Sequence, residues 1–334
     1  MALLVVLMVF VAAGGGWVLL NRSSNHAAGA TPTGTSAILT PAMAQQVLDH
    51  YWPRHEAALV AKNLPALAVM ASGPAKSWEQ AAVGCGCLDV ISPRRMLSST
   101  VIVPPQTRYP AHFIGEASTE TDGQGWIEVL VFTKQRSGSP WLVTEDSGYG
   151  LPPGNTPTLI ASLTAGFAPP ITAEQRQSAS HIASRWARVW QKAKNTGRIP
   201  TNTGFDLTGD TGNRVAYLAA HPQNAVQANG AYGHFRFYVS PKDPLIVAPV
   251  LNGGLLACQP VRESVIYSAL PGEQLLQDPL RHNWGPSLAP GTYPAVYSDD
   301  IWQTCFLIRA GLPITVLDQD IGGSVVTPAG ATST

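Results

Sequence analysis

The stretch that decides the fold is GWIEVLVFTKQRSGSPWLVTEDS, residues 125–147. β-Branched and aromatic residues dominate both ends of this stretch, as is typical of strands. The RSGS segment at 136–139, between the two ends, has the residues that turns require. The stretch therefore predicts a β-hairpin, and Trp141 opens its second strand.

The residues before this hairpin predict helices followed by further strands. Thr40 and Pro41 are a good N-cap and first helical residue, and apolar residues follow at helical spacing. Pro53 should end or kink this helix near Trp52, and a short helix is expected over 64–70. STVIVPP (99–105) and HFIGEAST (112–119) are strand-like. Helices followed by a meander predict an α+β domain over 39–150, with helices packed on one face of a curved antiparallel sheet.

A second unit repeats this order. After a linker at 151–170 rich in Pro, Gly and Thr, the segment 171–195 predicts another amphipathic helix with a capping box. YPAHF (109–113) and AYGHF (231–235) each place Tyr shortly before His-Phe on a presumed first long strand. We therefore expect two tandem α+β domains, the second over 171–322, and a disordered tail at 323–334.

The N-terminus predicts a membrane anchor. Residues 2–20 carry no charge, and as a helix they would reach about 28 Å, close to the thickness of a hydrocarbon core. No basic residue precedes the run and Trp17 lies near its far end, which favours an uncleaved single-pass transmembrane helix over 1–22. Taken alone, Arg22 on the C-terminal side of the run favours an orientation in which the bulk of the chain is cytoplasmic. The small-residue tether at 23–38 favours the opposite orientation, an extracytoplasmic protein at the cell membrane.

Composition argues against nucleic-acid binding. Lys+Arg and Asp+Glu balance at 21 each, and charged residues make up only 13% of the chain. No segment gathers the basic stripe that binding to a phosphate backbone requires. The densest basic spots, Arg94-Arg95 and 185–194, are interpreted as solvated helix and loop faces.

Motifs for catalysis, metals or cofactors are not evident, so no catalytic residue, metal ligand or cofactor is predicted. His50 and His55 lie about 140° apart on a helix and are interpreted as surface histidines. Glu116, Glu120 and Glu128 are single carboxylates on predicted strands. The pair Asp299-Asp300 is expected in a turn.

The repeated strand offers the candidate pocket residues His112, His234, Tyr109 and Tyr232. In both units the histidine precedes a phenylalanine on a strand whose alternate side chains should face the interior of the sheet's curve. A polar group in an apolar pocket is one interpretation. A half-buried strand histidine that is hydrogen-bonded to the backbone is the favoured one.

The four cysteines form two predicted pairs. Cys258 and Cys305 lie on strand-like runs of one domain and should form a disulfide outside the cytoplasm. Cys85 and Cys87 are then left to each other in AVGCGCLDV, as a staple or a reducible redox pair. The two other pairings would tie the first domain to the second, and a zinc site of four cysteines lacks a second close pair.

LTPAMAQQVL (39–48), VPPQTRYPAHFIGEA (103–117) and VFTKQRSGSPWLVTEDS (131–147) give this chain a family resemblance. It resembles an uncharacterised actinobacterial family of membrane-anchored proteins and lipoproteins with one or two domains of nuclear-transport-factor-like or cystatin-like α+β fold. The resemblance covers 39–150 best and 171–320 in outline, and the lipoproteins' lipobox cysteine is absent. It implies a curved sheet around a pocket closed by helices and transfers no catalytic residue.

These observations together predict a membrane-anchored extracytoplasmic protein of the cell envelope. Residues 2–20 would hold it in the membrane, and its two domains would bind a small ligand, a peptide or an envelope protein without catalysis. The alternative is an extracytoplasmic thiol-disulfide oxidoreductase that uses Cys85 and Cys87.

Overall fold

A computed structural model describes residues 38–84, 93–150, 169–223, 231–250, 253–276, 291–318 and 323–328. The predicted anchor and tether, the linker at 151–168 and the Cys85/Cys87 pair lie outside the described residues. Among the helices that the structure describes, none has the length and apolar character to cross a membrane. Residues 36–334 form one compact unit.

The first half, residues 38–150, is an α+β arrangement. Its helices are α1 (Pro41–Val60), α2 (Leu64–Ala68) and α3 (Gly73–Gly84). Its strands are β1 (Arg95–Ile102), β2 (Ala111–Thr121), β3 (Gln124–Lys134) and β4 (Leu142–Gly150). They form an antiparallel sheet in the order β1-β2-β3-β4, so the predicted hairpin of 125–147 is confirmed as β3 and β4.

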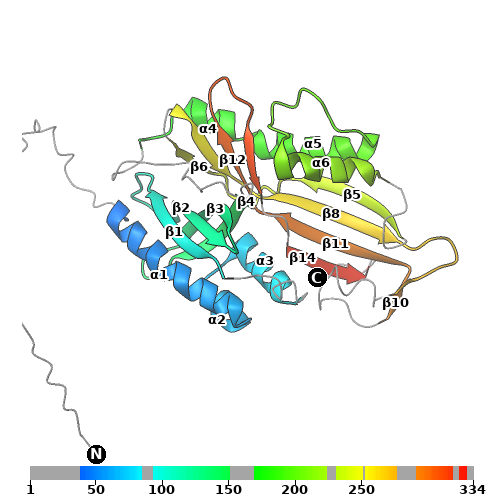
Figure 1. Cartoon of the computed structure of the whole chain (residues 1–334), viewed down its shortest axis with the longest axis horizontal. Helices are drawn as coiled ribbons and strands as arrows, with labels where there is room; N and C mark the ends of the chain where they lie inside the picture. Colours follow the sequence, from blue (N-terminus) through cyan, green and yellow to red (C-terminus); the bar gives the residue numbers. More distant parts are fainter. Residues whose placement is uncertain are drawn as a thin grey trace, which may run out of the picture. The chain divides into compact units, whose positions relative to one another are not determined.

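Helices α1 to α3 cover one face of this sheet (Figure 1). The core between them contains Leu48 of α1 with Phe113 and Phe132 of the sheet. Gly115 allows α1 to approach closely, because an added Cβ there would lie 3.2 Å from a methyl carbon of Leu48. A glycine at this point of β2 therefore sets the distance between helix and sheet.

Helix α1 continues past Pro53, so of the two outcomes predicted near Trp52, an end or a kink, the end is wrong. Proline removes one backbone donor from the helix. The residues around it compensate by packing, since Trp52 and Leu59 are buried against the sheet. Burial of side chains on both sides of a proline can outweigh the lost hydrogen bond.

The second half begins with three helices. They are α4 (Ala173–Ala179), α5 (Ile182–Thr196) and α6 (Gly209–Ala220). The capping box predicted for Thr172 and Gln175 is present, but the expected single helix is divided at Ser180-His181 into α4 and α5. Trp186 and Trp190 of α5 are buried in the core of this half, as their spacing predicts.

Two four-stranded antiparallel sheets follow, in the orders β14-β11-β8-β5 and β13-β12-β7-β6. Their strands are β5 (Tyr232–Tyr238), β6 (Ile246–Pro249), β7 (Leu255–Cys258), β8 (Val261–Ser268), β11 (Ala295–Trp302), β12 (Thr304–Ile308), β13 (Thr315–Asp318) and β14 (Gly323–Pro328). A short pair, β9 (Leu275–Leu276) with β10 (Thr292–Tyr293), stands apart from them. Only Gln259-Pro260 separates β7 from β8, and only Gln303 separates β11 from β12. Each of these two continuous runs of chain therefore contributes one strand to each sheet.

Two expectations about these strands need correction. Residues 323–328, which the sequence places in a frayed tail, pair with β11 as β14. The rest of the predicted tail, residues 329–334, lies outside the described residues. Asp299 and Asp300 lie on β11 and not in a turn. Both errors have one cause, because an edge strand and its neighbour carry polar residues wherever one face of the sheet is not buried.

The two halves share a core between two sheets. The face of the first sheet that points away from α1 packs on the sheet β13-β12-β7-β6. Aliphatic residues from both sheets form this layer: Ile114, Ile127 and Val129 from one, Leu256, Leu307 and Leu317 from the other. The layers are thus helices, sheet, sheet and helices (Figure 1).

Hydrogen bonds fix the joint between the halves at the end of β11. The backbone N–H of Asp146 donates to Oε1 of Gln303 at 2.6 Å. The backbone N–H of Thr304 donates to Oε1 of Glu145 at 3.1 Å. All four residues are buried. Adjacent residues of β4 therefore hold the point where β11 passes into β12.

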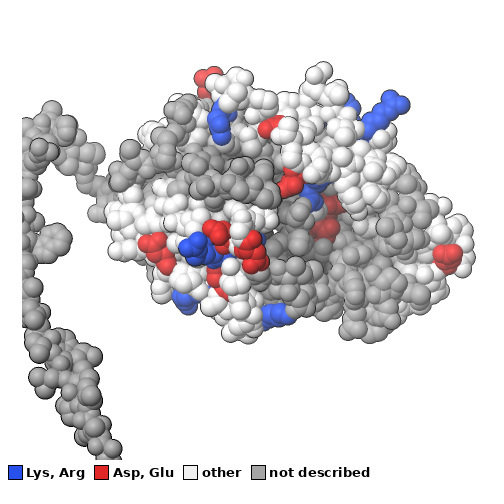
Figure 2. Space-filling model, viewed as in Figure 1, with Lys and Arg blue, Asp and Glu red and all other residues white. Residues whose placement is uncertain are grey.

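The surface is lightly charged. Figure 2 shows Lys and Arg side chains interspersed with Asp and Glu over the face that it presents. This agrees with the low charged fraction of the chain, 13%. A mixed surface of this kind gives no long-range field for one sign of partner.

Candidate functional site

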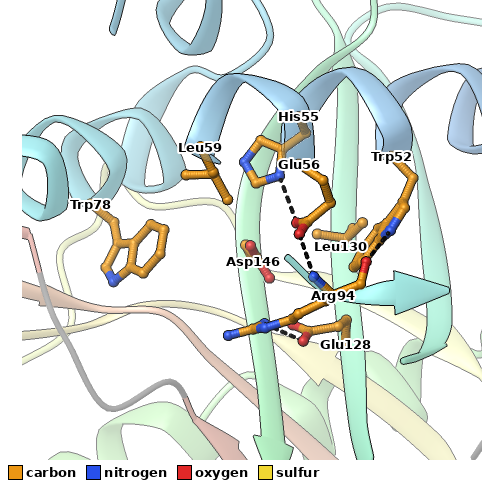
Figure 3. A pocket seen from close by; sticks show the side chains of 9 residues that line it. All are labelled: Trp52, His55, Glu56, Leu59, Trp78, Arg94, Glu128, Leu130 and Asp146. Atoms are coloured by element: carbon orange, nitrogen blue, oxygen red, sulfur yellow. Dashed lines mark hydrogen bonds and ion pairs between the residues drawn. The ribbon is translucent and has the colours of Figure 1, made fainter. Parts of the chain in front are cut away.

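A small cavity lies between α1, α3 and the first sheet, on the helix-covered face. Figure 3 shows that Trp52, His55, Glu56 and Leu59 reach it from α1. Trp78, Arg94, Glu128, Leu130 and Asp146 complete its lining. The cavity offers about 20 Å³ to the centres of water molecules, and one water needs about 10–15 Å³ by the same measure. It therefore has room for one or two waters.

His55 is held between two carboxylates. Its Nε2 lies 2.9 Å from Oε1 of Glu79, and its Nδ1 lies 3.7 Å from Oε1 of Glu56. Burial would lower the pKa of His55, but the nearby carboxylates of Glu56 and Glu79 outweigh burial and raise this pKa to about 9. His55 is therefore an imidazolium at neutral pH.

Arg94 forms the second ion pair of the cavity. Its guanidinium binds the carboxylate of Glu128, and it lies over the ring of Trp126 at 5.0 Å from the centroid. The backbone N–H of Arg94 donates to Oε2 of Glu56 at 2.7 Å. The charge of Glu128 raises the pKa of Arg94 further. Arg94 thus connects the strand that carries Glu128 to helix α1.

Asp146 has a raised pKa of about 8, because burial and the charge of Glu128 outweigh the attraction of His55 and Arg94. The carboxylates of Glu56, Glu79 and Glu128 already outnumber the two cations, His55 and Arg94. A fourth carboxylate would add to this excess of negative charge in a medium of low dielectric constant. Asp146 therefore holds a proton at neutral pH.

The second half has its buried acid in the same row of its sheet, one strand away from the position that corresponds to Asp146. Across the first sheet, Gly115 is paired with Leu130 and Leu130 with Asp146. Two residues after the other His-Phe pair, Phe237 is paired with Glu263 and Glu263 with Asp300. Glu263 accepts a hydrogen bond from Nε1 of Trp302 at 2.9 Å, and burial followed by the charge of Asp300 raises its pKa to about 8.

Lys194 of α5 is a cation of this second cluster. Its Nζ donates to the backbone O of His221 at 2.8 Å and lies 3.5 Å from the centroid of the Phe235 ring. Burial lowers the pKa of Lys194 to about 8, against the charge of Glu263. Both halves therefore place ionisable groups between their helices and their sheet.

Three interpretations from the sequence are wrong at these sites. His55 is buried and not on the helix surface, and Arg94 and Lys194 are largely buried and not on solvated faces. Their partners come from other elements: Glu79 lies on α3, Glu128 on β3 and Glu263 on β8. The sequence carries only a weak signal for the burial of His55. His55 lies four residues after Tyr51, so the two residues share one face of α1. Tyr51 is buried, and the two rings stack with their centroids 4.9 Å apart.

The candidate pocket residues of the sequence do not line this cavity. Tyr109 and Tyr232 are exposed. His112 is half-buried, and its backbone N–H donates to Oε1 of Gln106 at 2.7 Å. His234 is exposed, with its Nδ1 3.3 Å from Nε2 of Gln223. The neighbouring Phe113 and Phe235 take the helix-facing positions instead.

Cys258 and Cys305 form a disulfide, as their positions predict. They face each other across β7 and β12 with their Cα atoms 4.0 Å apart. Both are fully buried in the core that the two sheets share. The bridge therefore lies in the layer that joins the two halves. The Cys85/Cys87 pairing stays a prediction, because these residues are not among those described.

Within the described ranges no cluster of three or more His, Cys, Asp or Glu is arranged to hold a metal ion. Comparison of the chain with family models, with curated proteins and with solved structures finds no match. The first cavity can hold water and a proton beside His55, and its ion pairs connect α1, α3 and the sheet.

Proposed function

We propose that this protein is a membrane-anchored extracytoplasmic binding module of the cell envelope. The disulfide between Cys258 and Cys305 is the observation that carries the proposal. Disulfides persist in oxidising compartments and are rare in the cytosol. A structural bridge at the centre of the shared core suits a chain that folds outside the cytoplasm.

The sequence supplies the attachment to the membrane in this proposal. Residues 2–20 are apolar enough and long enough to span a bilayer, and 23–38 are a small-residue tether. Together they would keep the folded unit, residues 36–334, close to the membrane surface. Such an arrangement suits a protein that meets ligands or other proteins of the envelope.

The small size of the first cavity favours a protein that binds its partners through its surface and does not convert a substrate in this cavity. Ligand pockets usually offer about 300–1,000 Å³, whereas this cavity has room for one or two waters. Its charged side chains are paired with one another, as Arg94 is with Glu128 and His55 with Glu79. In this proposal these ion pairs hold the helices on the sheet, and the contacts with a ligand or partner are made by the protein surface.

The redox state of the bridge in living cells tests the proposal. Cells that express the full chain are quenched in acid, their free thiols are alkylated with a light maleimide, and the thiols released by reduction are alkylated with a heavy one. Peptide mass spectrometry should find the heavy label on both Cys258 and Cys305. The light label on most copies of these two residues would contradict an extracytoplasmic location.

A further inference from the structure

The junction of β11 and β12, residues 302–304, links the acid clusters of the two halves. Nε1 of Trp302 donates to Oε2 of Glu263, in the second half, at 2.9 Å. Oε1 of Gln303, the next residue, accepts the backbone N–H of Asp146, in the first half, at 2.6 Å. Both acids are buried. Consecutive residues of the junction thus contact one ionisable cluster on each side.

A third acid lies in the contact itself. Oε1 of Glu145 accepts the backbone N–H of Thr304 at 3.1 Å, and only 3% of Glu145 is exposed. Successive side chains of a strand point to opposite faces, so Glu145 points toward the second half while Asp146 points into the cavity. Burial raises the pKa of Glu145 well above its usual range, against the hydrogen bond from Thr304. The junction therefore passes three acids in succession.

Acidic and basic groups face the three acids from the elements that pack on them. The groups that face Asp146 are Tyr51, His55, Glu56, Glu79, Arg94 and Glu128. The groups that face Glu263 are Lys194, Arg214, Tyr267 and Asp300. Asp243 faces Glu145, and Arg262 already binds Asp243 through two hydrogen bonds. Ionisation of the three acids would therefore add negative charge on both sides of the junction.

Ionisation of these acids favours entry of water at the junction. A buried carboxyl group that loses its proton costs several kcal/mol unless water or a cation reaches it. Burial raises the pKa of Asp146 and of Glu263 to about 8, with help from the charges of Glu128 and Asp300. Opening of the junction would let water reach the acids and would return each pKa toward its ordinary value. Each acid then favours the open junction about tenfold more strongly with every pH unit up to about 8.

We propose that the junction is a pH-sensitive contact between the two halves. When its acids ionise, Gln303 and Thr304 separate from β4 and water enters the shared core, while the helices and strands on either side remain folded. Three consecutive residues that each hydrogen-bond to a buried acidic residue carry this proposal. The contact goes beyond the proposed function, because it lies inside the folded unit and does not depend on attachment to a membrane.

The disulfide reports whether the junction opens. Cys305 follows Thr304 directly, and the backbone N–H of Gln259, next to Cys258, donates to the backbone O of Thr304 at 3.0 Å. Both cysteines are fully buried, so a phosphine in water reaches their sulfur atoms only when the junction or the whole chain opens. Urea separates the two routes, because opening a few residues exposes little surface and depends weakly on urea, whereas global unfolding depends on it strongly.

The rate at which tris(carboxyethyl)phosphine reduces the bridge tests the proposal on the full chain in detergent micelles, from about pH 6.5 to 9. Each rate is divided by the rate for oxidised glutathione at the same pH, which removes the pH dependence of the reagent. We expect this ratio to rise at least about tenfold up to pH 8 and then to level off, because the acids are ionised in both states above that pH. The rise should persist, with little change in rate, in urea below the unfolding transition.

Substitutions that cannot ionise identify the acids responsible. Asp146→Asn and Glu263→Gln should each flatten the rise, and the triple variant that also carries Glu145→Gln should remove it. The control Glu273→Gln changes an exposed glutamate of the second half and should follow the wild type. If the triple variant does not fold, the single variants decide. A ratio that stays constant over the whole pH range, a rise with the urea dependence of global unfolding, or a rise that the single variants leave intact would overturn the proposal.

Discussion

Replacing Cys258 and Cys305 with alanine is expected to lower the free energy of unfolding by about 4 kcal/mol. The bridge closes a loop with a sequence separation of 47. Opening that loop restores chain entropy to the unfolded state, and the loss is a large fraction of the stability of an ordinary domain. Urea denaturation at neutral pH, followed by tryptophan fluorescence, measures the change.

Single substitutions provide the control for this result. Cys258→Ala or Cys305→Ala alone already opens the bridge, so each should cost nearly as much as the double variant, and the two effects should not add. Wild-type protein unfolded with a reductant present should reach the same midpoint as the double variant. A double variant within about 1 kcal/mol of the oxidised wild type would show that the bridge is not a main source of stability.

Stability should fall by several kcal/mol as the pH rises from 6.5 to 9. The pKa of His55 is raised to about 9, so its contribution is fully present below its unfolded pKa of about 6.5 and is lost as the pH rises through 9. A shift of this size corresponds to about 3 kcal/mol. Asp146, with a raised pKa of about 8, favours folding while it holds its proton. Its contribution declines from about pH 4 to 8, so both groups act in the same direction.

The variant Asp146→Asn separates the two groups. An amide cannot ionise, so the variant should be more stable than the wild type by about 2 kcal/mol at pH 8 to 9, relative to their difference at pH 6.5. It should still lose the contribution of His55. The matched control is Asp122→Asn in the exposed turn between β2 and β3, which should follow the wild type. Wild-type stability that stays constant or rises over this range would contradict the assigned protonation states.

Local signals in the sequence predicted the strands and helices well. The hairpin of β3 and β4 is marked by β-branched strands around a turn at 136–139, and the capping box at Thr172 begins α4 as expected. The sequence also supports the pair Cys258 and Cys305, because both lie on strand-like runs of one domain. These features depend on residues close in sequence or on a choice among few alternatives.

The arrangement of the candidate site could not be predicted in the same way. His55 and Glu79 are brought together by the packing of α1 on α3, and Arg94 reaches Glu128 across the sheet. A buried histidine and a surface histidine have similar local sequence contexts, so only tertiary packing distinguishes His55 from His50. The joint at Glu145 and Thr304 connects residues far apart in the chain. Neither periodicity nor composition carries that information.

Protease treatment of intact spheroplasts tests the central claim most directly. The spheroplasts express the full chain with a C-terminal epitope tag, and the membranes are collected after digestion and blotted. We predict that externally added protease removes the tag while a cytoplasmic marker protein survives, and that undigested protein stays in the membrane fraction after alkaline carbonate. A tag that resists digestion until the spheroplasts are lysed, or a chain released by carbonate, would contradict a membrane-anchored extracytoplasmic protein.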